Sequence, residues 1–144
     1  MARFSAAWRT AGAGSTTLPI ASLYATAAKR PKLLEVGVFN STTTAVAFAL
    51  RRFSTTGTQG STITAVYEDD SSQAAVATAK DTHTVTPTIT AGNIRVVSLG
   101  AAIGSGMIWT FGGLEIPNTT GDGIGLIVLT GTGQICDVSF TWSE

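Results

Sequence analysis

The feature that most constrains the fold of this chain is an alternation of apolar and polar residues along short runs, which Gly, Pro, Asn and Asp separate. An alternation with a period of two is typical of a β-strand that buries one face. It is clearest in the last third of the sequence, at Met107–Phe111, Gly123–Leu129 and Gln134–Trp142. In the last run every second residue from Cys136 to Trp142 is apolar. The pattern therefore predicts three strands that contribute to a core.

The same alternation predicts further strands nearer the N-terminus, giving about eight or nine in all at spacings of about 8–12 residues. Leu33–Phe39 and Thr44–Phe53 flank a polar turn at Asn40–Thr43, and we interpret this pair of runs as a hairpin. Gln73–Lys80 is compatible with either a two-turn helix or a strand. Pro87 cannot donate a ladder hydrogen bond, so its run is expected at an edge or at a bulge. The remaining predicted strands are Leu18–Thr26, Ile63–Tyr67, His83–Thr90 and Ile94–Leu99.

This pattern predicts an all-β fold, an antiparallel β-sandwich or jelly roll of about eight strands. The chain has 144 residues, which is a single-domain length and is enough to bury a core without disulfides or metals. We place the sandwich domain at residues 18–144. Residues 1–17 are expected to form an extended N-terminal arm or a short edge strand, ending in a flexible link at Ala11–Thr17.

The composition excludes some classes of partner. Hydrophobic residues make up 44% of the chain, charged residues only 12%, and the formal net charge is zero. A nucleic-acid-binding protein needs a basic face, so no nucleic-acid partner is expected. A membrane span needs about 18 consecutive apolar residues, and no such run exists, so no membrane partner is expected. A low charge does little to hold copies apart, which favours self-association or a permanent partner over the alternative of a monomer.

The sequence contains few residues that could support catalysis or bind a metal. His83 is the one histidine, no G-x-S-x-G nucleophile motif is present, and we expect His83 to be a surface or hydrogen-bonded structural residue. Cys136 is the one cysteine and is expected to be buried and inert. The acidic residues Glu68–Asp70 and Asp122 lack the spacing of a calcium loop. We therefore expect a protein that is not an enzyme and holds no metal or cofactor.

Carbohydrate binding is an open alternative, because lectin-like jelly rolls stack sugars on exposed aromatic rings. The candidate rings are those of Trp8, Tyr24, Tyr67 and Trp109. Aromatic residues in strands more often belong to the core, so most of these rings are expected to be buried.

Residues in the last third of the chain resemble a known group of proteins. They are Trp109, Phe111, Gly112-Gly113-Leu114, Ile116-Pro117, Gly123-Ile124-Gly125-Leu126 and Trp142-Ser143-Glu144. In this order they resemble the small head decoration, or cement, proteins of tailed bacteriophages, which have a β-sandwich or jelly-roll fold. The resemblance implies a location on the capsid exterior after synthesis in the host cytoplasm. It also implies a homotrimer that bridges neighbouring subunits of the major capsid protein.

The first functional hypothesis is therefore a non-enzymatic virion protein that decorates and stabilises a capsid. The alternatives are a carbohydrate- or receptor-binding sandwich of a phage fibre or tail and, third, a small β-fold hydrolase that uses His83. Arg3, Phe4, Trp8 and Arg9 are the candidate partner-binding residues, because Trp and Arg often anchor interfaces. In the other interpretation, Phe4 and Trp8 cap their own core.

Overall fold

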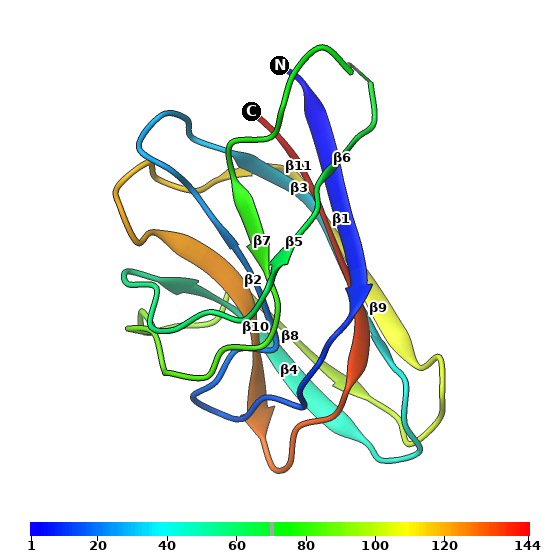
Figure 1. The fold of residues 1–144 in the computed structure, drawn as a ribbon. Coiled ribbons are helices and arrows are strands. Elements are labelled where there is room, and N and C mark those ends of the chain that lie inside the picture. Colours follow the sequence, from blue (N-terminus) through cyan, green and yellow to red (C-terminus); the bar gives the residue numbers. More distant parts are fainter. Residues whose placement is uncertain (70) are drawn as a thin grey trace.

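The computed structural model describes residues 1–69 and 71–144, and within them every regular element is a β-strand. The strands form two antiparallel sheets that pack face to face (Figure 1). The all-β sandwich expected from the sequence is confirmed. None of the described residues belongs to a helix that could cross a membrane.

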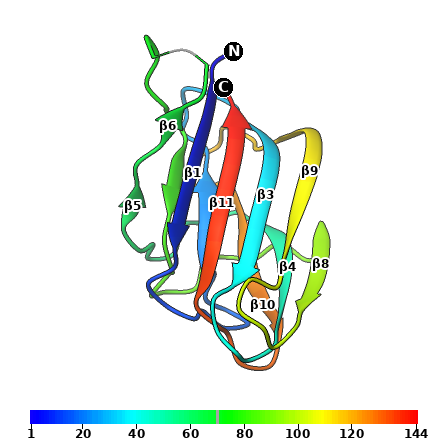
Figure 2. The ribbon, with the colours of Figure 1, turned by 90° about the vertical axis from the view of Figure 1, so that its right-hand side faces the viewer.

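Sheet A has five strands in the order β6-β1-β11-β3-β9, and Figure 2 looks onto its outer side. Its strands are β1 (Arg3–Arg9), β3 (Lys32–Asn40), β6 (Val66–Tyr67), β9 (Gly106–Glu115) and β11 (Cys136–Ser143). Sheet B has six strands in the order β5-β7-β2-β10-β4-β8. Its strands are β2 (Ala21–Tyr24), β4 (Val46–Phe53), β5 (Thr62–Ile63), β7 (Thr78–Lys80), β8 (Arg95–Leu99) and β10 (Gly123–Thr130).

The longer strands are connected as a jelly roll. Along the chain, β1 pairs with β11, β2 with β10, β3 with β9 and β4 with β8, which makes one long antiparallel ribbon. The ribbon folds on itself so that β11 also pairs with β3, and β10 also pairs with β4. A double sheet with these nested pairings has the strand order of a jelly roll.

Three short strands lie between β4 and β8 in the chain, and they close one side of the sandwich. β7 pairs with β2, and β5 pairs with β7, so both extend sheet B. β6 pairs with Phe4 and Ser5 of β1 and so belongs to sheet A. Only Thr64 and Ala65 separate β5 from β6, so the chain crosses here from one sheet to the other. Among the described residues no such crossing strand closes the opposite side, where β8 and β9 are the last strands (Figure 2).

The core lies between the sheets and follows the predicted alternation. In β11 the residues from Cys136 to Trp142 alternate strictly between buried and half-buried. Trp142 is fully buried and stacks on Phe4, with ring centroids 6.0 Å apart. Burying a side chain of this size stabilises the fold by roughly 1.5–3 kcal/mol. The last strand is therefore a central part of the core, as expected.

The predicted hairpin between residues 33–39 and 44–53 is wrong. Both runs are strands, but β3 lies in sheet A and β4 in sheet B, so the polar segment between them connects the two sheets. Asn40 fastens this connection. Its Nδ2 donates to the Thr44 carbonyl at 2.6 Å and to the Gly100 carbonyl at 3.1 Å, while its Oδ1 accepts from the Thr42 amide at 3.0 Å. These bonds satisfy a nearly fully buried side chain and replace the pairing that a hairpin would have made.

The expected N-terminal arm is also wrong. Residues Arg3–Arg9 pair along their whole length with β11, and β6 covers part of their other edge. The alternative of a short strand is found, although β6, and not this strand, lies at the edge of the sheet. The following segment, predicted as a flexible link, is held in place because the amides of Ala11 and Gly12 donate to the side chains of Asp81 and Thr82.

The structure changes several other predicted runs. Residues 63–67 are split between β5 and β6, and the run Gln73–Lys80 is a strand only at its end, in β7, and nowhere a helix. The run His83–Thr90 does not form a regular strand: its only pairings are isolated bridges at Val85 and Ile89. Pro87, in the middle of this run, is buried. Of Leu18–Thr26 only the centre is a strand, β2, and Thr26 forms an isolated bridge with Lys29.

A second apolar cluster lies on the outer face of sheet B. Tyr24 and Phe53 point away from the main core, and their rings pack against each other and against His83. All three are at most 3% exposed, because the segments 54–61 and 84–88 pass over this face. Gly125 makes room for the cluster, since a Cβ at this position would lie 2.7 Å from the Phe53 ring.

Candidate interaction surface

The four predicted partner-binding residues alternate along β1, so they point to opposite faces of sheet A. Phe4 and Trp8 point inward. Trp8 packs on Phe140, with ring centroids 6.0 Å apart, and its Nε1 donates to Asp81 Oδ1 at 3.2 Å. Both rings therefore belong to the protein's own core, and only Arg3 and Arg9 point outward. That these two arginines bind a partner stays a prediction.

The outer face of sheet A is flat and has small side chains at its centre. Ala7, Ser139 and Gly37 follow one another across three paired strands, and the larger Ile108 follows on the edge strand β9. Gly37 and Ser139 lie so close together that a Cβ on Gly37 would meet the Ser139 hydroxyl at 2.6 Å. In contrast to sheet B, no segment of the described chain passes over this centre, as Figure 2 shows. A broad, low surface of this kind can rest on another protein.

A shallow hollow of about 310 Å³ lies on this face. Its lining residues are Ala7, Trp8, Phe39, Asp137, Val138 and Ser139. The Phe39 ring forms one wall, and it occupies the space that a side chain on Gly106 would need. The hollow is therefore bounded by an aromatic ring on one side and by small residues in the middle.

An ion pair forms the polar end of the same face. Arg9 Nε and Nη2 donate to the two carboxylate oxygens of Asp137, at 2.7 and 2.9 Å. This fork-like bond lowers the pKa of Asp137 below its ordinary value. Both groups are largely exposed, so the pair contributes little to stability and is accessible to a partner.

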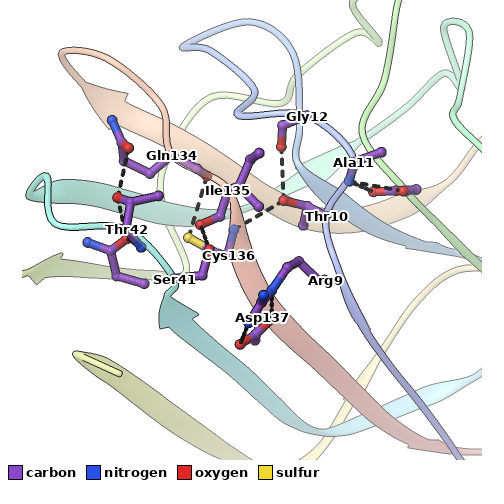
Figure 3. A network of polar contacts seen from close by, with 12 residues as sticks. Arg9, Thr10, Ala11, Gly12, Ser41, Thr42, Gln134, Ile135, Cys136 and Asp137 are labelled. Carbon is purple, nitrogen blue, oxygen red and sulfur yellow. Dashed lines mark hydrogen bonds and ion pairs between the residues drawn. The ribbon is translucent and has the colours of Figure 1, made fainter. Parts of the chain in front are cut away.

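Next to this ion pair, a network of polar contacts fixes the end of the sheet (Figure 3). The buried Thr10 donates to the Gly12 carbonyl at 2.9 Å and accepts from the Cys136 amide at 3.2 Å. On the other side, Ser41 Oγ donates to the Ile135 carbonyl at 2.5 Å. These bonds join three loops around the start of β11, so the rim of the outer face is well fixed.

The residues with the greatest chemical reactivity are enclosed. Cys136 is buried, as expected, and burial raises its pKa to about 12. His83 is 1% exposed, and its Nε2 shares a hydrogen bond with Ser22 Oγ at 2.8 Å. Burial lowers the pKa of His83 to about 4, so near neutral pH it is an uncharged part of the apolar cluster. This geometry does not favour His83 as a base for a substrate from solution. No group of three or more described acidic, His or Cys residues could hold a metal ion.

The four candidate sugar-stacking rings are not equally accessible. Tyr24 is 3% exposed and Trp109 is 9% exposed, while Trp8 is half-buried by its contacts with Phe140 and Asp81. Tyr67 is the one of the four that is exposed, at 53%. The carbohydrate-binding alternative therefore depends on this single ring.

Two features of this region were not predicted from the sequence: the anchor residue Asp81 and the exposed outer face of sheet A. Asp81 is a buried anchor that accepts hydrogen bonds from Trp8, Ala11 and Thr82, but in the sequence it is one acidic residue in a polar run. The outer face of sheet A consists of the polar and small residues that alternate with the core positions. The alternation in β1 and β11 could have indicated them, but not that the face stays uncovered.

In comparisons with protein-family models, curated proteins and solved structures, none matches this chain.

Proposed function

We propose that this chain is a non-enzymatic structural protein of a bacteriophage virion, which decorates and stabilises the capsid by bridging subunits of the major capsid protein. The observation that carries the proposal is the contrast between the two outer faces. Around Tyr24 and Phe53 the outer face of sheet B is covered by the protein's own loops, whereas the outer face of sheet A is firmly held at its rim and has no described segment over its centre. In this proposal the uncovered face of sheet A rests on the shell.

The chemistry of the chain supports an assembly role. Its net charge is zero and few residues are charged, so repulsion does little to oppose dense packing of many copies on a shell. The histidine and the cysteine are buried and therefore removed from solution. Many copies on a repetitive shell also gain avidity from individually weak contacts. The resemblance of the last third of the chain to capsid decoration proteins supports the choice of a shell as the partner.

The test is binding to capsids prepared without this protein, from the phage that encodes it. We expect purified protein to co-sediment with such capsids and to raise the temperature at which they open. Failure of the wild-type protein to bind them would overturn the proposal.

A matched pair of variants tests which face is used. Ala7→Arg places a long charged side chain at the centre of the uncovered face and should weaken binding at least about tenfold, because it lifts the surfaces apart. Ser98→Arg makes a comparable change at an exposed strand residue on the outer side of sheet B, where β8 is the edge, and should leave binding unchanged. Equal binding by the two variants would show that the face of sheet A is not the contact.

A further inference from the structure

The two edges of sheet A carry exposed apolar side chains that nothing in the described structure covers. At one edge, Val66 and Tyr67 of β6 are 57% and 53% exposed. At the other edge, Met107 and Ile108 of β9 are 41% and 51% exposed. Sheet edges of soluble proteins are usually protected by charge, proline or a covering segment. β9 has ten residues, and its one charged residue is Glu115, at the end of the strand.

The charges next to these two apolar pairs are opposite in sign. Glu68 and Asp69 directly follow β6, and the cation beside them is Arg3, which lies 3.9 Å from Glu68 and donates its amide to Asp69 at 2.8 Å. Beside β9, the Arg95 guanidinium lies over the Phe111 ring at 5.2 Å from its centroid. Among the described residues no carboxylate forms an ion pair with Arg95, whose Nη1 donates to the Ile94 carbonyl at 2.8 Å.

The order of these features is the same along both edges. Four antiparallel pairings separate β6 from β9 across sheet A, so the two strands run in the same direction (Figure 2). In that direction each edge first presents its apolar pair and then its charge. The apolar pair of β6 can therefore meet the apolar pair of β9 while the acidic residues reach the level of Arg95.

We propose that copies of this chain associate head to tail, with the β6 edge of one copy docked on the β9 edge of the next. Val66 and Tyr67 pack on Met107 and Ile108, and the carboxylates of Glu68 and Asp69 pair with Arg95. A two-fold contact of the β9 edge with itself would also bury apolar side chains, but it would bring no acid to Arg95. A head-to-tail contact closes into a ring or continues as a chain, depending on its rotation angle.

The first measurement is the molar mass of the wild-type protein by light scattering and sedimentation equilibrium, over a range of concentrations and without any other protein. Its outcome is therefore independent of the proposed capsid role. We expect an oligomer whose dissociation constant rises with salt, because charged pairs contribute to the contact. A monomer at every concentration would overturn the inference.

Two sets of variants separate the two edges. Arg95→Glu disables the β9 edge, and Glu68→Lys with Asp69→Lys disables the β6 edge, so each protein alone should associate at least about tenfold more weakly. Each keeps one intact edge, and the two altered edges again carry opposite charges, so an equal mixture should associate with the two variants in alternation, although each variant alone does not. Mixed variants that stay monomeric while the wild type associates would overturn the head-to-tail arrangement.

The controls guard against misfolding. A protein carrying all three changes has opposite charges across the contact again and should recover its association, which a misfolded protein would not do. Val85→Asp changes an equally exposed apolar residue in the loop over sheet B, at 53%, and should associate like the wild type. Tyr67→Ser and Ile108→Ser remove apolar contact without charge reversal and should each weaken association. If neither does, the apolar part of the contact is wrong.

Discussion

The two outer faces of the sandwich differ in what lies over them, although both belong to sheets with the same alternation. On the outer face of sheet B, segments 54–61 and 84–88 cover the part that holds Tyr24, Phe53 and His83, while Ser98 at the β8 edge stays exposed. The outer face of sheet A carries Ala7, Gly37 and Ser139 at its centre, and no described segment covers them. Part of one face is therefore a second core, and the other face is a surface.

Glycines take part in both faces, with different consequences. On sheet B, the absence of a side chain at Gly123 and Gly125 lets the rings of Tyr24 and Phe53 lie close to the strands. On sheet A, Gly37 faces a hydroxyl that can rotate away. The first pair is therefore required by packing, while Gly37 keeps the surface low.

The largest expected difference in stability between the two faces comes from substituting one phenylalanine on each of them. Phe53→Ala should lower the free energy of unfolding by about 3–5 kcal/mol, because it empties an enclosed site beneath the cover. Phe39→Ala, on the uncovered face, should lower it by only about 1 kcal/mol, because water can fill the space. Urea unfolding of both variants measures the difference, and similar losses would show that the faces are energetically alike.

The second test uses pH and acts on the covered face. The pKa of His83 is about 4 in the folded protein, against an ordinary value of 6.5, so as the pH falls the unfolded chain takes up the proton first. The contribution of His83 to stability is complete above about pH 6.5 and is lost progressively down to about pH 4, by roughly 3 kcal/mol.

The variant His83→Gln removes this titration and isolates it from that of the carboxylates. The unfolding free energy of the variant should therefore fall less than that of the wild type between pH 7 and pH 4.5. Urea unfolding at the two pH values measures this, and identical losses in both proteins would mean that His83 is not buried in its neutral form.

The smallest effect is expected from a pair of glycine substitutions. Gly125→Ala would bring a Cβ against the Ala21 carbonyl and 2.7 Å from the Phe53 ring, and should cost about 1–3 kcal/mol. A Cβ in Gly37→Ala would be too close only to the Ser139 hydroxyl, which can rotate, because its distances to Phe39 and Ile108 are ordinary contacts of 3.5 and 3.7 Å. Alanine is also favoured over glycine in a strand, so the cost should be close to zero. Thermal melts would rank the two, and a larger cost for Gly37→Ala would reverse the assignment of which glycine is structural.

The sequence predicted the strands better than their partners. The runs at residues 107–111 and 123–129 are strands in the structure, and the run at 134–142 is a strand from Cys136 onward, because apolar alternation reports directly which side of a strand is buried. The predicted hairpin at Asn40 was wrong because the alternation of two consecutive strands does not show which strands they pair with. The same sequence pattern fits a hairpin and two strands that lie in opposite sheets. The predicted N-terminal arm was wrong because the sequence of residues 1–17 is compatible with both a free arm and a strand. Only the pairing with β11 distinguishes the two.

The candidate surface was less accessible to sequence reasoning than the fold. Arg3 and Arg9 were singled out together with Phe4 and Trp8, but neighbours along a strand point to opposite faces, so the set is divided by the sheet. Uncovered residues such as Ala7 and Ser139 carry no compositional signal of their own.

By itself, the sequence determined that this protein is an all-β sandwich with its last strand in the core, because the alternation of side chains fixes which face of each strand is buried. Only the tertiary structure decided the jelly-roll order, the burial of His83 and which outer face is covered. These depend on where loops from distant parts of the chain come to rest, and no local pattern specifies that.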